Sequence, residues 1–408
     1  MSRSLRSKLA LLLAVAAAAC SDGGSTAPTI QPPKSPARQA IAQSVSVNLS
    51  SPGWHQEARR LVGQANMSPL AASRVYASLG VAQYRALRAV SSARLGGVVF
   101  ANGIGGGGRS GMEQWRGAIA GASVTVLSFL FPNAASDLEA RVIADGDAGQ
   151  GSTHPQFVRG VASGRTSGAA MVEHLKTDRF TVPWTGTVPT GPGMWIANGP
   201  PAGATFGGVA TYFLTSSNQF RPAPPPAFGS AAFLADLAEI KTLSDTRTPE
   251  QRLIANNWNY PTGSMTPPGY WNEIASQYIA EHGLDELGAA HVYALTGGAM
   301  EDALIACWEA KYHYWTIRPS QVESAITLVF ALPNHPSYPS GHSCVSAAAA
   351  TTLAALFPQH AVQLDRWVTQ AGLSRMYAGI HYRFDITAGA TLGADVAKWA
   401  LAHQQGLE

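Results

Sequence analysis

The chain has 408 residues, of which 46% are hydrophobic and 13% are charged, and its formal net charge is +3. It is long for a single domain, and its composition allows a large buried core. The small net charge is scattered, and no basic run interleaves with aromatic residues. A nucleic-acid-binding surface is therefore excluded.

The first 20 residues, MSRSLRSKLALLLAVAAAAC, have the pattern of a bacterial export signal. Arg3, Arg6 and Lys8 precede an apolar stretch over residues 9–19, which is too short to cross a bilayer as a permanent helix. The small residues before Cys20 resemble a loose bacterial lipobox, so we predict a lipoprotein-type signal peptide with lipidated Cys20 as the mature N-terminus. Ordinary signal cleavage nearby is the alternative. Both predict export, and lipidation predicts a periplasmic or cell-surface lipoprotein that meets the membrane only through its lipid.

Residues 21–37 are rich in proline, glycine and small polar residues, and this composition predicts a disordered tether. The folded domain is then expected over residues 38–408. Only two cysteines remain in it, Cys307 and Cys344, which excludes a disulfide framework. A single bridge between them is one alternative outside the cytoplasm, and buried free thiols are the interpretation that we favour.

The folded part reads as mostly helical, because apolar residues recur at helical spacing and no alternating run demands a sheet. Thr248 and Gln251 predict a capping box at the start of a further helix. The Pro/Gly-rich residues 180–227 are too many for a simple connection, so we expect an ordered meander over the helical body or a lid. Helices are predicted over residues 68–90, 111–131, 157–177 and 230–243.

A proline-rich turn ends in a helix start at residues 334–357, NHPSYPSGHSCVSAAAATTLAALF. Pro339 presets the backbone, Ser340 is a good N-cap, and Gly341 lets the backbone approach another group closely. The first turn of a helix also presents free N–H groups and a positive dipole end, which together suit an anion. An ordinary capped helix after a loop is the simpler interpretation of this stretch alone.

Two further blocks surround this turn in the sequence. Lys311 and Arg318 are seven residues apart, a spacing that would place both on one face of a helix. His381 and Asp385 follow Arg375 at a spacing of i and i+4, which would let the carboxylate bind one ring nitrogen and leave the other available. With Ser340, Gly341 and His342, these residues suit a tetrahedral oxyanion.

The three blocks resemble the signature K-x6-RP, PSGH and SR-x5-H-x3-D, which the phosphatidic acid phosphatase type 2 superfamily shares with the vanadium-dependent haloperoxidases. All eleven specified positions match in order and spacing over residues 311–385. The stretches RTPEQRLIANNW, TPPGYWNEIA and GGAMEDALIACWEAKYHYWTIRP look like the soluble haloperoxidase branch. This resemblance implies an all-α fold with a core of two four-helix bundles.

Residue roles follow from the resemblance. His381 would be the axial ligand of vanadium in vanadate, oriented by Asp385. His342 would be the acid–base group that takes a proton from hydrogen peroxide. Lys311 would also polarise the bound peroxide. The groups expected to bind the vanadate oxygens, or phosphate in the same site, are Lys311, Arg318, Ser340, Gly341 and Arg375.

Two aromatic residues are candidates for contact with the substrate halide. Trp308 matches an aromatic wall position of some family members. His335 falls where the family varies between phenylalanine and histidine, and histidine there is common in bromoperoxidases. A histidine in a surface loop is the alternative interpretation of His335.

The resemblance implies oxidation of a halide by hydrogen peroxide to hypohalous acid, with bromide and iodide favoured and an organic acceptor as a further partner. The same residues also suit an acid phosphatase, in which His381 attacks phosphorus and His342 protonates the leaving alcohol. A lipid-anchored oxyanion-binding protein without turnover is a third hypothesis. A homo-oligomer is expected only by analogy with relatives.

Overall fold

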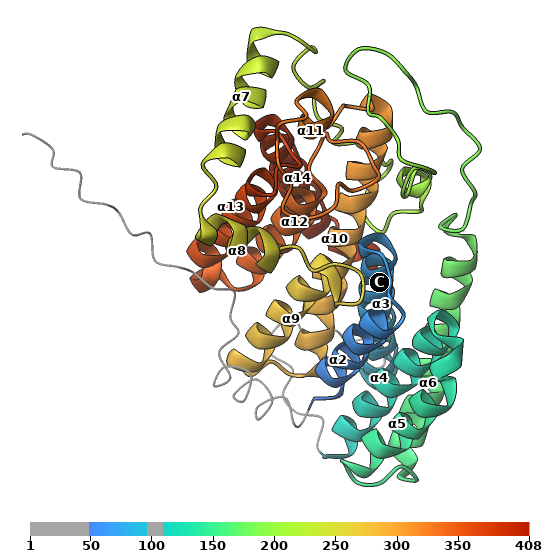
Figure 1. The fold of residues 1–408 in the computed structure, drawn as a ribbon. Coiled ribbons are helices and arrows are strands. Elements are labelled where there is room, and N and C mark those ends of the chain that lie inside the picture. Colours follow the sequence, from blue (N-terminus) through green and yellow to red (C-terminus); the bar gives the residue numbers. More distant parts are fainter. Residues whose placement is uncertain (1–48, 96–108, 408) are drawn as a thin grey trace, which may run out of the picture.

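The computed structural model describes residues 49–95 and 109–407 (Figure 1). These residues form 13 α-helices and no sheet, which confirms the all-α prediction. The predicted signal peptide, Cys20 and the tether lie outside the described residues. The helices are α2 (Ser50–Gln64), α3 (Pro69–Leu95), α4 (Arg109–Leu130), α5 (Ala135–Asp147), α6 (Pro155–Thr177), α7 (Ala231–Asp245), α8 (Pro249–Asn257), α9 (Thr266–Glu281), α10 (Glu286–Tyr314), α11 (Pro319–Val322), α12 (Gly341–Leu356), α13 (Ala361–Tyr377) and α14 (Arg383–Ala402).

The four helices predicted from periodicity correspond to α3, α4, α6 and α7, with shifts of a few residues at their ends. The capping box of α8 is also confirmed. The Thr248 hydroxyl accepts a hydrogen bond from the Gln251 N–H at 3.1 Å, and the Thr248 N–H donates to Gln251 Oε1 at 3.0 Å. Local pattern and capping chemistry thus locate these helices without tertiary information.

The long helix α10 lies between two groups of helices (Figure 1). It packs against α3 on one side and against α12 and α14 on the other. On the first side α4 packs on α6 and α3, and on the second side α13 joins α12. Most of α10 is buried, because its alanine, leucine and glycine residues surround the helix rather than forming one stripe. The two groups of helices therefore share one central helix.

Glycines allow α4 and α6 to approach closely. A Cβ atom on Gly121 would lie 2.2 Å from the Val161 carbonyl oxygen, and one on Gly164 would lie 2.1 Å from the Ala118 carbonyl oxygen. Both distances are far inside van der Waals contact, so the two backbones touch where a side chain would otherwise separate them.

The Pro/Gly-rich segment is an ordered meander over the helical body, as predicted. Its regular structure consists of a single 3₁₀ turn (Phe206–Gly208) and one bridge between Met194 and Thr316. Asp302 of α10 anchors it, since its buried carboxylate accepts the N–H groups of Tyr212, Phe213 and Leu214 at 2.8, 2.8 and 3.0 Å. A side chain thus replaces the backbone partners that this irregular segment lacks.

Within the described ranges, no helix combines the length and apolar character that crossing a membrane requires.

Candidate active site

A cavity of about 780 Å³ opens where the N-terminus of α12 meets the meander and the loop that follows α8. Its lining is largely apolar, with Leu70, Phe180 and Phe206 among the contributing residues. Four side chains of the signature region also line it, together with one glycine. They are His335, His342, Arg375, His381 and Gly341.

Lys311 and Arg318 do not share a helix face, so that prediction is wrong. Helix α10 ends at Tyr314, and its C-cap Trp315 adopts a left-handed conformation with φ of 52°. Arg318 then lies in extended backbone, with φ of −84° and ψ of 152°. Because Arg318 precedes Pro319, the proline ring disfavours a helical conformation there. The break turns the chain back toward the site.

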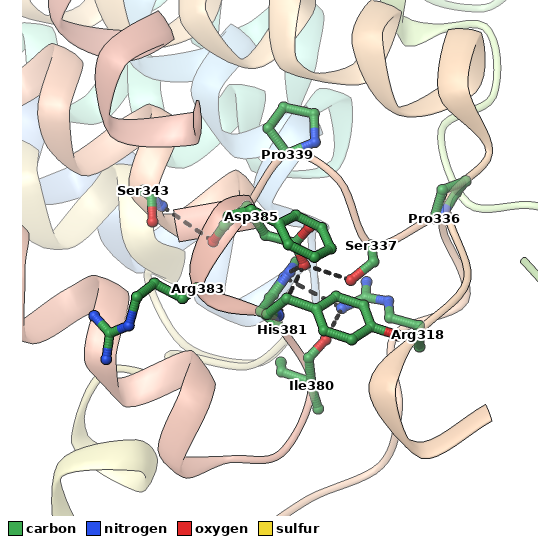
Figure 2. A network of polar contacts seen from close by, with 12 residues as sticks. Arg318, Pro336, Ser337, Pro339, Ser343, Ile380, His381, Arg383 and Asp385 are labelled. Carbon is green, nitrogen blue, oxygen red and sulfur yellow. Dashed lines mark hydrogen bonds and ion pairs between the residues drawn. The ribbon is translucent and has the colours of Figure 1, made fainter. Parts of the chain in front are cut away.

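His381 and Asp385 form the predicted pair, with His381 Nδ1 at 2.8 Å from Asp385 Oδ2 (Figure 2). They do not share a helix face, however, because α14 begins at Arg383 and leaves His381 in the preceding turn. The same carboxylate oxygen accepts the Ser337 hydroxyl at 2.5 Å and the Tyr382 N–H at 3.1 Å. Three donors therefore fix the carboxylate that orients the imidazole.

The available nitrogen of His381 is Nε2. Since a carboxylate can only accept, Nδ1 carries the proton and Nε2 of the neutral ring presents a lone pair. Burial lowers the pKa of His381 well below its usual value, and the nearby Arg318 and Lys311 lower it further. Arg318 Nη1 lies 3.2 Å from Nε2, so a guanidinium faces the lone pair.

Three cations are buried around this imidazole, and their relative exposures are 0% for Lys311, 0% for Arg318 and 1% for Arg375. Burial lowers the pKa of Arg318 to about 10 and that of Arg375 to about 9. Among the described residues, their hydrogen-bond partners are carbonyl oxygens, a hydroxyl and imidazole nitrogens rather than carboxylates. Asp385 is buried near Lys311 and Arg318 with its Oδ1 unpartnered, so one carboxylate faces three cations and positive charge is in excess.

The ammonium group of Lys311 does not point into the cavity as a free hydrogen-bond donor but binds backbone carbonyls. Its Nζ donates to the carbonyl oxygens of Pro336 and Ser337 at 2.9 and 2.8 Å, and also to that of Pro339. In this conformation Lys311 holds the turn before α12 and acts on the cavity through its charge. Neither Lys311 nor Arg318 lines the cavity surface.

Ser340, Gly341 and His342 lie at the start of α12, as predicted. The Ser340 hydroxyl accepts the Ser343 N–H at 3.4 Å and so acts as the N-cap. A Cβ atom on Gly341 would lie 2.9 Å from the Trp308 ring, which explains why glycine is needed there. His342 Nε2 lies 2.9 Å from the Trp258 carbonyl oxygen, and this contact fixes the ring tautomer.

His335 and Trp308 meet beside the cations. Their ring centroids are 5.0 Å apart, and His335 Nδ1 lies 3.1 Å from Arg318 Nη2. Both residues line the cavity. The position of His335 therefore differs from that of a surface loop histidine, while its effect on halide choice stays a prediction.

Cys307 and Cys344 are buried and free, as favoured from the sequence. Cys307 Sγ lies 3.8 Å from the Pro339 carbonyl oxygen, so the thiols pack behind the turn that Lys311 holds.

Sequence reasoning missed Ser337 and Phe330. Ser337 binds Asp385 across 48 positions in the chain, and the side chain of Phe330 lies under the Arg375 guanidinium at 5.1 Å. Both belong to the loop before α12, where no periodic pattern predicts which side chains turn inward. The one available signal was their closeness in sequence to residues 339–342.

Comparisons with known proteins agree with this geometry. The sequence profile of the PAP2 superfamily matches residues 287–407. A non-specific acid phosphatase from Providencia stuartii is 28% identical over 175 residues, which is 40% of this chain and 66% of the phosphatase. The chain thus matches just under two thirds of that relative's length.

Solved structures extend the likeness to most of the chain. A bacterial vanadium-dependent iodoperoxidase superposes with a TM-score of 0.72 and 23% identity, covering 86% of this chain and 95% of the other. A bacterial vanadium-dependent chloroperoxidase in apo form superposes with a TM-score of 0.66 and 15% identity, covering 84% and 95%. The fold is therefore that of the vanadium-dependent haloperoxidases. The profile match over residues 287–407 is to the PAP2 superfamily, in agreement with the resemblance found in the signature.

Proposed function

We propose that this chain is a vanadate-dependent haloperoxidase-like enzyme that uses hydrogen peroxide to oxidise bromide or iodide to hypohalous acid. The observation that carries the proposal is the excess of buried positive charge around the neutral His381. Buried charges need compensation, and a bound oxyanion supplies it where the protein provides no further carboxylate. The cavity thus suits a multiply charged oxyanion beside its cationic and histidine side chains.

The residues present fit vanadate. His381 Nε2 offers the ligand nitrogen, and the cations with the N-terminus of α12 offer charge and N–H groups for its oxygens. When bound, vanadate supplies a Lewis-acid centre at which hydrogen peroxide is activated without a change in the oxidation state of the metal. The holding residues would be Lys311, Arg318, Ser340, Gly341, Arg375 and His381.

His342 can take the proton of the incoming peroxide. Its Nε2 donates to the Trp258 carbonyl, so Nδ1 remains as the base. Burial lowers the pKa of His342 well below its usual value, and the neighbouring Arg375 lowers it further. The lowered pKa keeps the imidazole unprotonated, so the ring is available as a base when peroxide arrives, whereas an acid role would require it to carry a proton already.

An acid phosphatase is the second candidate, and the 28% identical phosphatase supports it. The lone pair of His381 Nε2 could attack phosphorus as well as bind vanadium. His342 would then have to protonate the leaving alcohol, which its lowered pKa disfavours. The likeness to haloperoxidases also runs through 86% of the chain, including the helices before α10, whereas the phosphatase match covers 40%.

Paired assays on purified protein test the proposal. We expect halide oxidation with vanadate and peroxide, and little hydrolysis of a phosphate ester without vanadate. His381→Ala should abolish both vanadate binding and halide oxidation while the circular dichroism spectrum is unchanged. His313→Ala, which changes an exposed histidine at the end of α10, is the matched control.

Three results would contradict the proposal. Stoichiometric vanadate retained by His381→Ala after gel filtration would overturn the ligand assignment. Efficient phosphate-ester hydrolysis with no halide oxidation would establish the phosphatase instead, and binding of vanadate or phosphate without turnover would indicate an oxyanion-binding protein.

A further inference from the structure

A second group of metal-ligating side chains lies away from the oxyanion pocket, where the end of α9 meets the connection between α12 and α13. His282 Nε2 and His360 Nε2 face each other at 3.0 Å. Glu281 Oε1 lies 3.8 Å from the same nitrogen of His360. One possible ligand atom from each of these three side chains lies within 4.8 Å of the other two. We infer that Glu281, His282 and His360 form a binding site for a divalent transition-metal ion such as Zn²⁺.

The spacing suits a tetrahedral ion. Two nitrogens that bind zinc at its usual distances and angle lie about 3.3 Å apart. The two imidazoles are therefore already close to the separation that a shared ion would impose. Two nitrogens and one carboxylate oxygen form a donor set that suits zinc. Calcium and magnesium suit it less, because they favour oxygen ligands.

A fourth donor is at hand. The side-chain amide nitrogen of Gln359 lies 2.7 Å from His282 Nε2. Turning this amide over would present its oxygen at the same place, and a water molecule could fill the position instead. The side chain of Glu281 is 56% exposed and that of His360 is 19% exposed, so an ion can reach the cluster from solvent.

Aromatic packing holds both imidazoles. The His360 ring stacks on Tyr278 with centroids 4.0 Å apart and an interplanar angle of 5°. The ring of His282, the C-cap residue of α9, stacks on Phe357 with centroids 5.1 Å apart and an interplanar angle of 29°. The ligands therefore need little rearrangement to bind an ion, which lowers the entropy cost of binding.

Such an ion would join two parts of the fold that are distant in sequence. It would tie the last turn of α9 to the 3₁₀ turn Pro358–His360, at the end of α12 opposite to Gly341. The 16 residues of α12 separate this cluster from the oxyanion pocket by roughly 24 Å along the helix. The site would act on stability rather than on the reaction.

Titration of the untagged, metal-free protein with Zn²⁺ by calorimetry tests the inference. We expect His282→Ala and His360→Ala each to lose one equivalent of zinc that the wild type binds. His403→Ala should keep that equivalent, since His403 is also an exposed helix C-cap histidine but lies outside the cluster. Zinc bound by histidines of the oxyanion pocket would be common to all four proteins and cancels in the comparison.

A thermal measurement gives a second readout. Zinc should raise the melting temperature of the wild type and of His403→Ala by a few degrees and leave both cluster variants unchanged. Glu281→Gln keeps both imidazoles and should bind zinc more weakly than the wild type. Equal zinc stoichiometry in wild type and cluster variants, or loss of the equivalent in His403→Ala, would overturn the inference.

Discussion

The charge of Lys311 is the residue-scale feature with the clearest dependence on pH. Burial lowers the pKa of Lys311 from 10.5 to about 8. As pH rises through about 8, the free protein loses one positive charge beside the oxyanion pocket. The affinity for vanadate or phosphate should therefore fall above this pH.

Lys311→Met isolates this effect. The variant should bind the anion about 10- to 100-fold more weakly at neutral pH, as expected when a buried positive charge near the anion is lost. Calorimetry across pH gives the ratio of wild-type to variant affinity. In this ratio the effect of the anion's own ionisation cancels, because it changes both affinities equally. A ratio that stays constant from pH 7 to about 10 would contradict the assignment.

The same pKa has the opposite effect on stability in the anion-free protein. Between pH about 8 and 10.5 the folded state binds fewer protons at Lys311 than the unfolded state does. The contribution of this residue to the free energy of unfolding therefore increases as pH rises through that window.

We expect His335 to influence which halide is oxidised, because it lies between Trp308 and Arg318 at the cavity surface. Chloride is the hardest of the three halides to oxidise. A histidine at this position can share protons with peroxide, whereas a hydrocarbon ring would keep the pocket drier. We expect wild type to oxidise bromide and iodide but little chloride. His335→Phe should raise chloride oxidation relative to bromide in steady-state halogenation of a phenol indicator, and an unchanged ratio would leave His335 without this role.

At the scale of elements, the contact between α4 and α6 constrains the fold tightly. A Cβ atom on Gly164 would lie 2.1 Å from the Ala118 carbonyl oxygen, so the backbones would have to separate. Gly164→Ala should lower the free energy of unfolding by about 1–3 kcal/mol, as overpacking does elsewhere. Urea denaturation measures this, and Gly208→Ala is the control because a Cβ atom there meets nothing within 4 Å.

The affinity for vanadate separates a local effect from a general one. We expect it to be unchanged in Gly164→Ala, because α4 and α6 lie in the group of helices away from α12 and α14 (Figure 1). A loss of affinity without a loss of stability would show that the two groups of helices are coupled.

The elements also show how far the sequence predicts this protein. The periodic helices and the His381–Asp385 pair were predicted because both depend on residues close in sequence. The geometry behind the pair was not, since α14 begins after His381. The break before Arg318 was visible in the proline that follows it, yet the motif spacing suggested a continuous helix.

Contacts between distant segments could not be predicted in this way. Ser337 meets Asp385, and the Trp258 carbonyl fixes His342, only because the loops after α8 and before α12 converge on one cavity. Neither loop has a periodicity that says which groups point inward. The cluster of Glu281, His282 and His360 was missed for the same reason.

At the scale of the whole molecule, α10 joins the two groups of helices and also carries the residues that arrange the site. In its C-terminal half, Trp308 lines the cavity and Lys311 holds the turn before α12, while Asp302 holds the meander that supplies part of the cavity wall. A substitution that displaces α10 should therefore affect both the packing of the core and the geometry of the site.

The hydrogen bonds from the meander to Asp302 should slow amide hydrogen exchange in that segment. Residues 212–214 belong to no helix, and such amides usually exchange quickly with solvent. Here the N–H groups of Tyr212, Phe213 and Leu214 are bound by a buried carboxylate, so they should exchange as slowly as amides of the helical core. In Asp302→Asn an amide NH₂ group replaces one acceptor oxygen and meets an N–H donor, and mass spectrometry should find faster exchange in this peptide. In the wild type, a single carboxylate would thus give this irregular segment the slow amide exchange of a helix.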